Sequence, residues 1–173
     1  KSKELYLGKY EVTEVKAPYG MTINAETHNV ELTYAGQEVA VTETATSFYN
    51  ERQKVEISIA KVLEQNEEYK IGMNDEIRNI SFGLYAEKEL VSSSGTVIPA
   101  DGLIEVISLS EDGTAKVHTD LPFGNYYVKE IAADEHYMLS DEKFPVEFEY
   151  AGQDTALVKL AVNDGKPIEN KLL

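Results

Sequence analysis

One short pattern occurs twice in this chain, and each copy puts a carboxylate among the apolar side chains of a strand. The copies are GKYEVTEV at residues 8–15 and GNYYVKEI at residues 124–131. Alternate side chains of a β-strand point to the same face, so Glu14 and Glu130 each share a face with the tyrosine and valine before them. An unpaired ionised carboxylate is costly to bury. Each glutamate must therefore be neutral, paired or chemically employed.

The same alternation predicts that a lysine and an asparagine also lie on apolar faces. In VEISIAKVL at residues 55–63, Lys61 falls on the face of the valine, isoleucine and leucine side chains. Asn170 shares a face with its apolar neighbours near residue 172, and Asn50 follows Phe48 in the same way. The pattern therefore predicts that a lysine, a glutamate and an asparagine enter one core.

The two copies belong to a longer repeat with a spacing of 116 residues, which also relates the YAGQ tetrapeptides at 34–37 and 150–153. We therefore divide the chain into the C-terminal part of a repeat, residues 1–53, and a complete repeat, residues 54–173. Residues 1–53 contain Glu14 as the equivalent of Glu130 and, after a short loop difference, Asn50 as the equivalent of Asn170, but no counterpart of Lys61. Either upstream residues are missing from this sequence or another chain supplies the strand, and we expect a fragment boundary.

Short apolar runs separated by turn signals predict an all-β fold. Asp112-Gly113 between two β-like runs is typical of a hairpin, and frequent turns favour a β-sandwich. The polar stretch 64–79 interrupts this rhythm and predicts a surface insertion or a short helix. The strands are expected at 55–63, 80–86, 103–109, 114–118, 124–131, 143–149, 155–162 and 167–172.

Several motifs together resemble the tandem B-type repeat domains of collagen-binding and pilin-like (SpaA-type, prealbumin-like) surface proteins of Gram-positive bacteria. They are KAPYG at 16–20, FGLY at 82–85, LPFGNY at 121–126 and IEN at 168–170. The resemblance implies tandem Ig-like or prealbumin-like β-sandwich repeats. It also implies a side-chain amide, an isopeptide bond, between Lys61 and Asn170, formed with Glu130 as the proton shuttle.

Physical chemistry is compatible with such a bond. A lysine with its ordinary pKa is an ammonium and is not a nucleophile, whereas burial lowers a lysine pKa and raises that of a carboxylic acid. A neutral amine beside an acid can attack a carboxamide, and ammonia leaves. Proximity then replaces a conventional active site, so the reaction occurs once and the chain is not an enzyme in the usual sense. The alternative is an ordinary buried ion pair with a hydrogen-bonded amide.

Composition excludes several other classes of function. The chain has 31 acidic and 16 basic residues and a net charge of −15, which argues against nucleic acid and anionic membranes as partners. It contains no cysteine, no phosphate-binding glycine loop and no apolar run long enough to span a bilayer. Its three histidines lack metal-ligand spacing, so we expect neither a cofactor nor a metal.

Two classes of function remain. The first is a structural stalk module of an extracellular, cell-wall-anchored adhesin or pilin, with the anchor outside this segment and neighbouring repeats as partners. The second is a binding module that presents loops such as 64–79 to a host extracellular matrix protein or glycan. A third idea is that residues 1–53 accept a lysine-bearing strand from another chain and couple to it. The sequence does not identify a host ligand, the number of repeats, pilus membership or whether the bond has formed.

Overall fold

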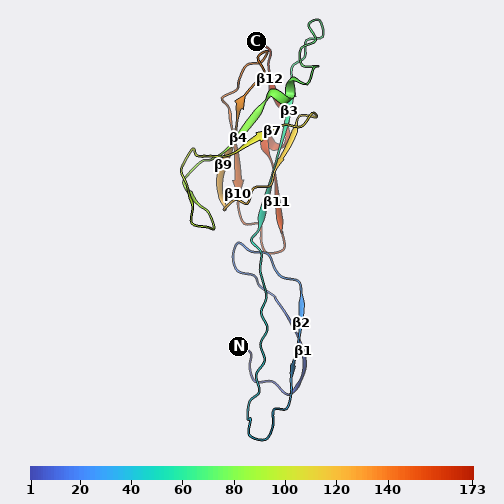
Figure 1. Ribbon diagram of the computed structural model, residues 1–173, viewed down its shortest axis with the longest axis vertical. Coiled ribbons are helices and arrows are strands. Elements are labelled where there is room, and N and C mark those ends of the chain that lie inside the picture. The colour runs from blue at the N-terminus through green and yellow to red at the C-terminus, as the bar shows by residue number, and fades with distance from the viewer. The chain divides into compact units, whose positions relative to one another are not determined.

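The computed structural model describes residues 1–173 and divides into two compact units. Unit 1 consists of Lys1–Gln53 together with Ala151–Ala156, and unit 2 of Lys54–Tyr150 with Leu157–Leu173 (Figure 1). The chain therefore crosses between the units three times. Residues 151–156, which the repeat pattern places in the second copy, pack with the first.

Both units consist of strands joined by turns, and unit 2 also contains two short 3₁₀ helices, which confirms the all-β prediction. None of the helices is long and apolar enough to span a membrane. The elements are β1 (Gly8–Thr13), β2 (Thr27–Leu32), β3 (Lys54–Leu63), η1 (Glu76–Asn79), β4 (Ser81–Ala86), β5 (Leu90–Val91), β6 (Val97–Ile98), β7 (Leu103–Ser108), β8 (Thr114–Val117), β9 (Gly124–Ala132), β10 (Lys143–Phe148), β11 (Leu157–Ala161), η2 (Val162–Gly165) and β12 (Ile168–Asn170).

Unit 1 contains one two-stranded antiparallel sheet, in which Gly8 of β1 pairs with Leu32 of β2. Burial alternates along β1, as its apolar alternation predicts, but the inward Tyr10 and Val12 are only half-buried. Their repeat equivalents in unit 2, Tyr126 and Val128, are 1% and 0% exposed. The difference arises because unit 2 has a second sheet over this face.

Unit 2 is built from two four-stranded sheets and a separate two-stranded sheet of β5 and β6. One is fully antiparallel in the order β10-β9-β4-β7. In the other, β3 pairs with β8 antiparallel and with two strands parallel to it. Of these, β11 lies along residues 54–58 of β3 and β12 along residues 61–63. A single ten-residue strand thus organises its sheet, and the short β12 is held against the C-terminal end of β3.

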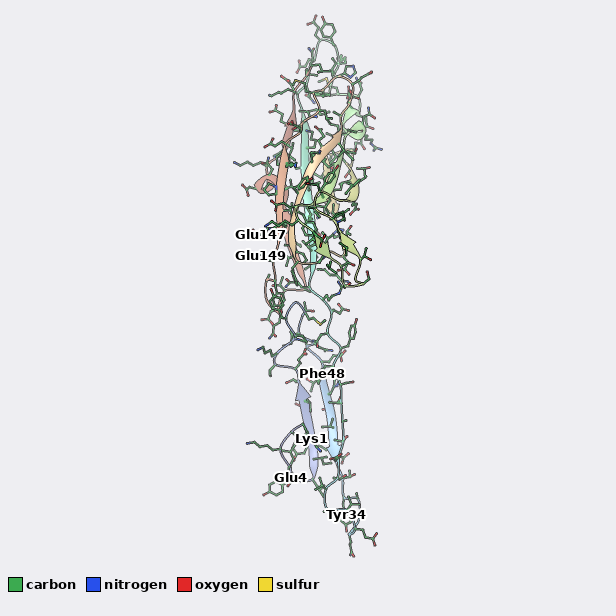
Figure 2. The ribbon with its side chains drawn as sticks, turned by 90° about the vertical axis from the view of Figure 1, so that its left-hand side faces the viewer. Lys1, Glu4, Tyr34, Phe48, Glu147 and Glu149 are labelled. Atoms are coloured by element: carbon green, nitrogen blue, oxygen red, sulfur yellow. The ribbon has the colours of Figure 1, made fainter.

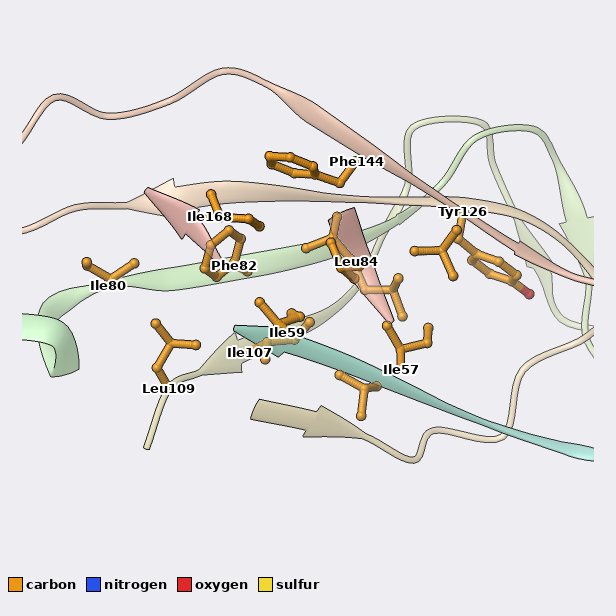
Figure 3. Close-up of a cluster of buried hydrophobic side chains, with 14 of the residues drawn as sticks. Ile57, Ile59, Ile80, Phe82, Leu84, Ile107, Leu109, Tyr126, Phe144 and Ile168 are labelled. Atoms are coloured by element: carbon orange, nitrogen blue, oxygen red, sulfur yellow. The ribbon is translucent and has the colours of Figure 1, made fainter. Parts of the chain in front are cut away.

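The core lies between these two sheets. Its side chains come from alternate positions of each strand, as the period-2 pattern predicts, and those of β3 and β4 point toward one another (Figure 3). Ile57, Phe82 and Leu84 are each 0% exposed. Burial of such apolar side chains stabilises a fold by roughly 1.5–3 kcal/mol each. The polar side chains described next enter this apolar layer.

The predicted insertion at 64–79 forms turns and ends in the 3₁₀ helix η1. It is anchored by a carboxylate rather than by apolar packing alone. Glu76 is 8% exposed, and its two oxygens accept the backbone N–H groups of Gly72 (3.0 Å) and Asn74 (2.6 Å). These hydrogen bonds lower the Glu76 pKa against the desolvation that raises it, so the anchor is a carboxylate at neutral pH.

Candidate functional site

Three strands position the three residues that the alternation pattern singles out. Lys61 of β3 has Ile168 of β12 as its parallel register partner, so Asn170, two residues further on, faces the same side. Glu130 comes from β9 in the opposite sheet, where it pairs with Phe82 of β4. Their side chains meet between the sheets, because all three strands turn these positions toward the core.

The three side chains form one hydrogen-bonded cluster. The Lys61 Nζ donates a short hydrogen bond to Asn170 Oδ1 and lies 3.6 Å from Glu130 Oε1. Asn170 Nδ2 donates to the same Glu130 Oε1 at 2.7 Å. The other carboxyl oxygen, Oε2, accepts the backbone N–H of Ser140 at 2.9 Å. Amine, amide and carboxyl group are therefore mutually in contact, and Ser140 fixes the carboxyl orientation.

The cluster is almost completely shielded from water. Lys61, Glu130 and Asn170 are 5%, 2% and 2% exposed, and the ring centroid of Phe82 lies 5.8 Å from the Lys61 Nζ. Desolvation lowers the pKa of Lys61 below its ordinary value, while Glu130 and, more weakly, Glu169 oppose that shift. The site therefore favours the neutral amine more than water does, and the neutral amine is the nucleophilic form.

The equivalent pair in unit 1 is also hydrogen-bonded, but there both donors share one carboxyl oxygen, whereas Glu130 uses its two oxygens separately. Asn50 Nδ2 donates to Glu14 Oε2 at 2.7 Å and to the Thr22 carbonyl at 3.0 Å, and the Asn24 N–H donates to the same Glu14 oxygen at 2.6 Å. Asn24 is the repeat equivalent of Ser140. Both Glu14 and Asn50 are half-buried, and no lysine lies within ion-pair distance of Glu14.

The histidines lie outside this site. His118 contacts Glu56 at 2.8 Å, His136 contacts Asp134 at 2.7 Å, and His28 stacks on Phe48. No group of three or more metal-ligating side chains is close enough to hold an ion. The insertion 64–79, which the sequence suggests as a binding loop, borders a hollow of about 580 Å³ that residues 111–113 also line.

Sequence reasoning assigned no role to three groups that the structure places at key positions. The Ser140 N–H orients Glu130, and the ring of Phe82 covers the Lys61 amine. Gln53, which looks like a linker residue, is 2% exposed and holds residues 151–156. No signal in the sequence marks Gln53, because its partners at residues 151, 152 and 155 are distant from it along the chain.

Comparison with solved structures finds several proteins with a similar fold. The Bacillus anthracis TIE protein matches at 25% identity with a TM-score of 0.56, over 98% of this chain and 26% of that protein. The chain thus spans about a quarter of that protein's length. The group B streptococcus pilus 2b backbone protein matches at 17% identity with a TM-score of 0.42, over 92% of this chain and 52% of that chain.

A C-terminal fragment of the pilus adhesin SpaC from Lactobacillus rhamnosus GG matches at 17% identity with a TM-score of 0.43, over 99% of this chain and 79% of that one. No curated protein sequence matches the chain. The SpaA family of prealbumin-like fold domains matches residues 56–166, which is most of unit 2 and more than half of the sequence. The chain therefore belongs to the SpaA prealbumin-like domain family, as its motifs predict.

Proposed function

We propose that this chain is a structural stalk module of a Gram-positive cell-surface adhesin or pilin, and that an amide bond between Lys61 and Asn170 crosslinks unit 2. Glu130 acts as the proton shuttle. The observation that carries the proposal is the contact of amine, carboxamide and carboxyl group at a site that is at most 5% exposed at each residue. The family match supports a cell-surface location.

The reaction is a transamidation that needs no external reagent. The neutral Lys61 Nζ attacks the Asn170 Cγ, and the Nζ–Cγ bond forms as the Cγ–Nδ2 bond breaks. Glu130 Oε1, which contacts both nitrogens, takes the proton that the amine loses and delivers it to the departing nitrogen. The products are a secondary amide and one molecule of ammonia. Contact between the reacting groups supplies the effective concentration that an intermolecular reaction lacks.

The position of the crosslink suits a load-bearing role. It joins β3, the first strand of unit 2, to β12, the last, across a sequence separation of 109 residues. End-to-end tension would then pass through the covalent link instead of peeling the strands between them. Closing a loop of this length also lowers the entropy of the unfolded chain, which stabilises the fold by roughly 4–5 kcal/mol.

Intact mass spectrometry tests the proposal directly. The purified chain is expected to be lighter than its calculated mass by one ammonia, and peptide mapping is expected to recover a branched peptide that joins Lys61 to Asn170. Lys61→Ala, Glu130→Ala and Asn170→Ala should each restore the calculated mass. The matched control is Lys171→Ala, an exposed lysine beside Asn170, which should keep the deficit. A parent chain of full mass would reduce the cluster to a buried hydrogen-bonded ion pair.

By the same reasoning, we propose Glu14 and Asn50 as the shuttle and acceptor of unit 1, for a lysine on a strand placed as β3 is in unit 2. Their mutual hydrogen bond of 2.7 Å supports this. A peptide with the sequence of β3, KVEISIAKVL, is a suitable probe. A covalent adduct at Asn50 that has lost one ammonia is expected, and its absence at saturating peptide would withdraw this assignment alone.

The second candidate function is binding by the insertion 64–79. The hollow beside it and the exposure of Tyr69 (69%) and Met73 (47%) favour it, since exposed aromatic and methionine side chains are typical of binding surfaces. A stalk module should bind no host matrix protein or glycan. If the chain does bind one, replacement of Tyr69 and Met73 by serine should abolish binding and leave the mass deficit unchanged.

A further inference from the structure

Residues 151–156 rest on a defined seat at one end of unit 1, formed by the backbone of Val15–Ala17 and Thr22–Ile23. Gln153 makes all three hydrogen bonds to it. The Ala17 N–H donates to Gln153 Oε1 at 2.7 Å, and Gln153 Nε2 donates to the Val15 carbonyl at 3.1 Å. The Ile23 N–H donates to the Gln153 backbone carbonyl at 2.9 Å. The seat therefore recognises a glutamine in a turn.

The side chain of Gln53 also holds residues 151–156 on the seat. Its Nε2 donates to the carbonyls of Gly152 (2.9 Å) and Thr155 (2.7 Å), and its Oε1 accepts the N–H of Ala151 at 2.9 Å. A buried amide that satisfies three backbone groups is expensive to replace. The loop on this seat is thus held by two glutamine side chains.

Unit 2 contains the same seat, formed by Ile131–Ala133 and Met138–Leu139. Three pairs of backbone hydrogen bonds recur around it between equivalent residues of the two repeats. In the first pair, the Met21 N–H donates to the Pro18 carbonyl (3.1 Å), as the Tyr137 N–H does to that of Asp134 (2.9 Å). In the second, the Thr22 N–H donates to the Glu51 carbonyl (2.8 Å), as the Met138 N–H does to that of Lys171 (3.1 Å). In the third, the Gln53 N–H donates to the Gly20 carbonyl (2.9 Å), as the Leu173 N–H does to that of His136 (3.0 Å). The local backbone frame of the seat is therefore the same in both units.

No segment of residues 1–173 covers the seat of unit 2. Met138 and Leu139 are each 57% exposed, whereas their equivalents on the occupied seat, Thr22 and Ile23, are half-buried. The N–H groups of Ala133 and Leu139, equivalent to those of Ala17 and Ile23, make no hydrogen bond within the chain. The open seat thus combines exposed apolar side chains with two free backbone donors.

A loop with the right sequence and conformation is exposed on the same chain. Residues 34–37 repeat the YAGQ of 150–153, and Gly36 (φ +104°) adopts the left-handed conformation of Gly152 (φ +93°). Tyr34, 69% exposed, lies in the loop beyond the end of β2 (Figure 2). Gln37, the equivalent of Gln153, is exposed as well.

We propose that the seat on unit 2 binds the YAGQ loop of a second copy of this repeat, displayed in this chain at 34–37. Gln37 of the second copy accepts the Ala133 N–H and donates to the Ile131 carbonyl, as Gln153 does on unit 1. Leu173 takes the place of Gln53, so the three hydrogen bonds of that side chain are replaced by apolar contact and binding is weaker. Such a head-to-tail contact is heterologous and generates open chains of molecules. It does not depend on the Lys61–Asn170 bond.

Nuclear magnetic resonance on mixed samples tests this surface. A ¹⁵N-labelled Gln37→Ala chain supplies the open seat without a competing loop, and unlabelled wild-type chain supplies the loop. At concentrations up to about 1 mM, the range that detects weak association, the amide signals of Ala133 and Leu139 are expected to shift with added wild-type chain. Unlabelled Gln37→Ala chain, the matched control, should leave both signals in place.

A second variant tests the seat side. Leu139→Asp, added to the labelled chain, should abolish the response at Ala133, whereas Val91→Asp, at an equally exposed position on β5, should preserve it. Both substitutions lie at exposed positions, and the dispersed spectrum of each variant checks its fold. The proposal is overturned if wild-type chain causes no shift, if the Gln37→Ala chain shifts the signals equally, or if the shifts map away from the seat.

Discussion

The Asn170 side chain is bonded on both sides at once, because its Oδ1 accepts from Lys61 and its Nδ2 donates to Glu130. The two partners come from opposite sheets of unit 2, so the asparagine links the two sheets across the core, near the C-terminal end of β3. This arrangement puts the leaving nitrogen beside the proton shuttle and the carbonyl beside the amine. It also makes the site sensitive to any substitution that moves one of the three strands.

Loss of the lysine should lower stability by more than the loss of a hydrogen bond. Lys61→Met keeps the length of the side chain and removes the amine, so the crosslink and its effect on the unfolded chain disappear. We expect the free energy of unfolding, measured in guanidinium chloride, to fall by about 4–5 kcal/mol. The control Lys171→Met removes only an exposed ion pair with Glu169 and should change it by less than about 1 kcal/mol. Equal effects would contradict a covalent link.

Gly113 controls the position of Lys61 on its strand. The Gly113 carbonyl accepts the Lys61 N–H at 2.8 Å, its φ is +79°, and a Cβ there would lie against the Lys61 carbonyl oxygen. Gly113→Ala should therefore lower the free energy of unfolding by about 2–3 kcal/mol and slow crosslinking. Gly95 has a similar φ of +84° but open space around it, so Gly95→Ala should cost only about 1 kcal/mol and leave crosslinking unchanged. Matching losses would show that backbone strain alone is responsible.

Stability should decline as pH rises through the pKa of His136. The hydrogen bond to Asp134 raises that pKa above the ordinary histidine value, while desolvation partly opposes it. The stabilisation is fully present below the ordinary pKa and is lost as the pH passes the raised value, because the folded state then binds no extra proton. Urea denaturation between about pH 6 and 8 measures this loss. In His136→Gln, the free energy of unfolding should fall less over this pH range. An unchanged pH dependence in that variant would mean that other groups cause the loss of stability.

The loop on unit 1 should depend on Gln53. Gln53→Leu leaves the carbonyls of Gly152 and Thr155 and the N–H of Ala151 without their partner. Hydrogen exchange of the Ala151 amide is expected to accelerate about tenfold or more, since each lost hydrogen bond to a buried group costs about 1–3 kcal/mol. Gln65→Leu, whose side chain donates one bond at an exposed site, should not affect it. Unaltered exchange at Ala151 in Gln53→Leu would mean that Gln153 alone holds the loop.

Local alternation carried most of the information about which side chains enter the core. The period of two along β3, β9 and β12 predicted the buried faces of Lys61, Glu130 and Asn170, because a strand turns alternate residues to one side wherever it is placed. The repeat spacing related Glu14 and Asn50 to their counterparts in the same way. These inferences needed no knowledge of neighbouring strands.

Only the tertiary structure decided which strands meet. The parallel register of β12 on β3, the position of Glu130 in the opposite sheet and the union of residues 151–156 with unit 1 all depend on pairings between distant segments. The burial of Gln53 and Glu76 depends on them as well, since a polar side chain is buried only where backbone groups from elsewhere in the fold satisfy it. Sequence spacing determines the face of a strand, whereas long-range packing determines what that face contacts.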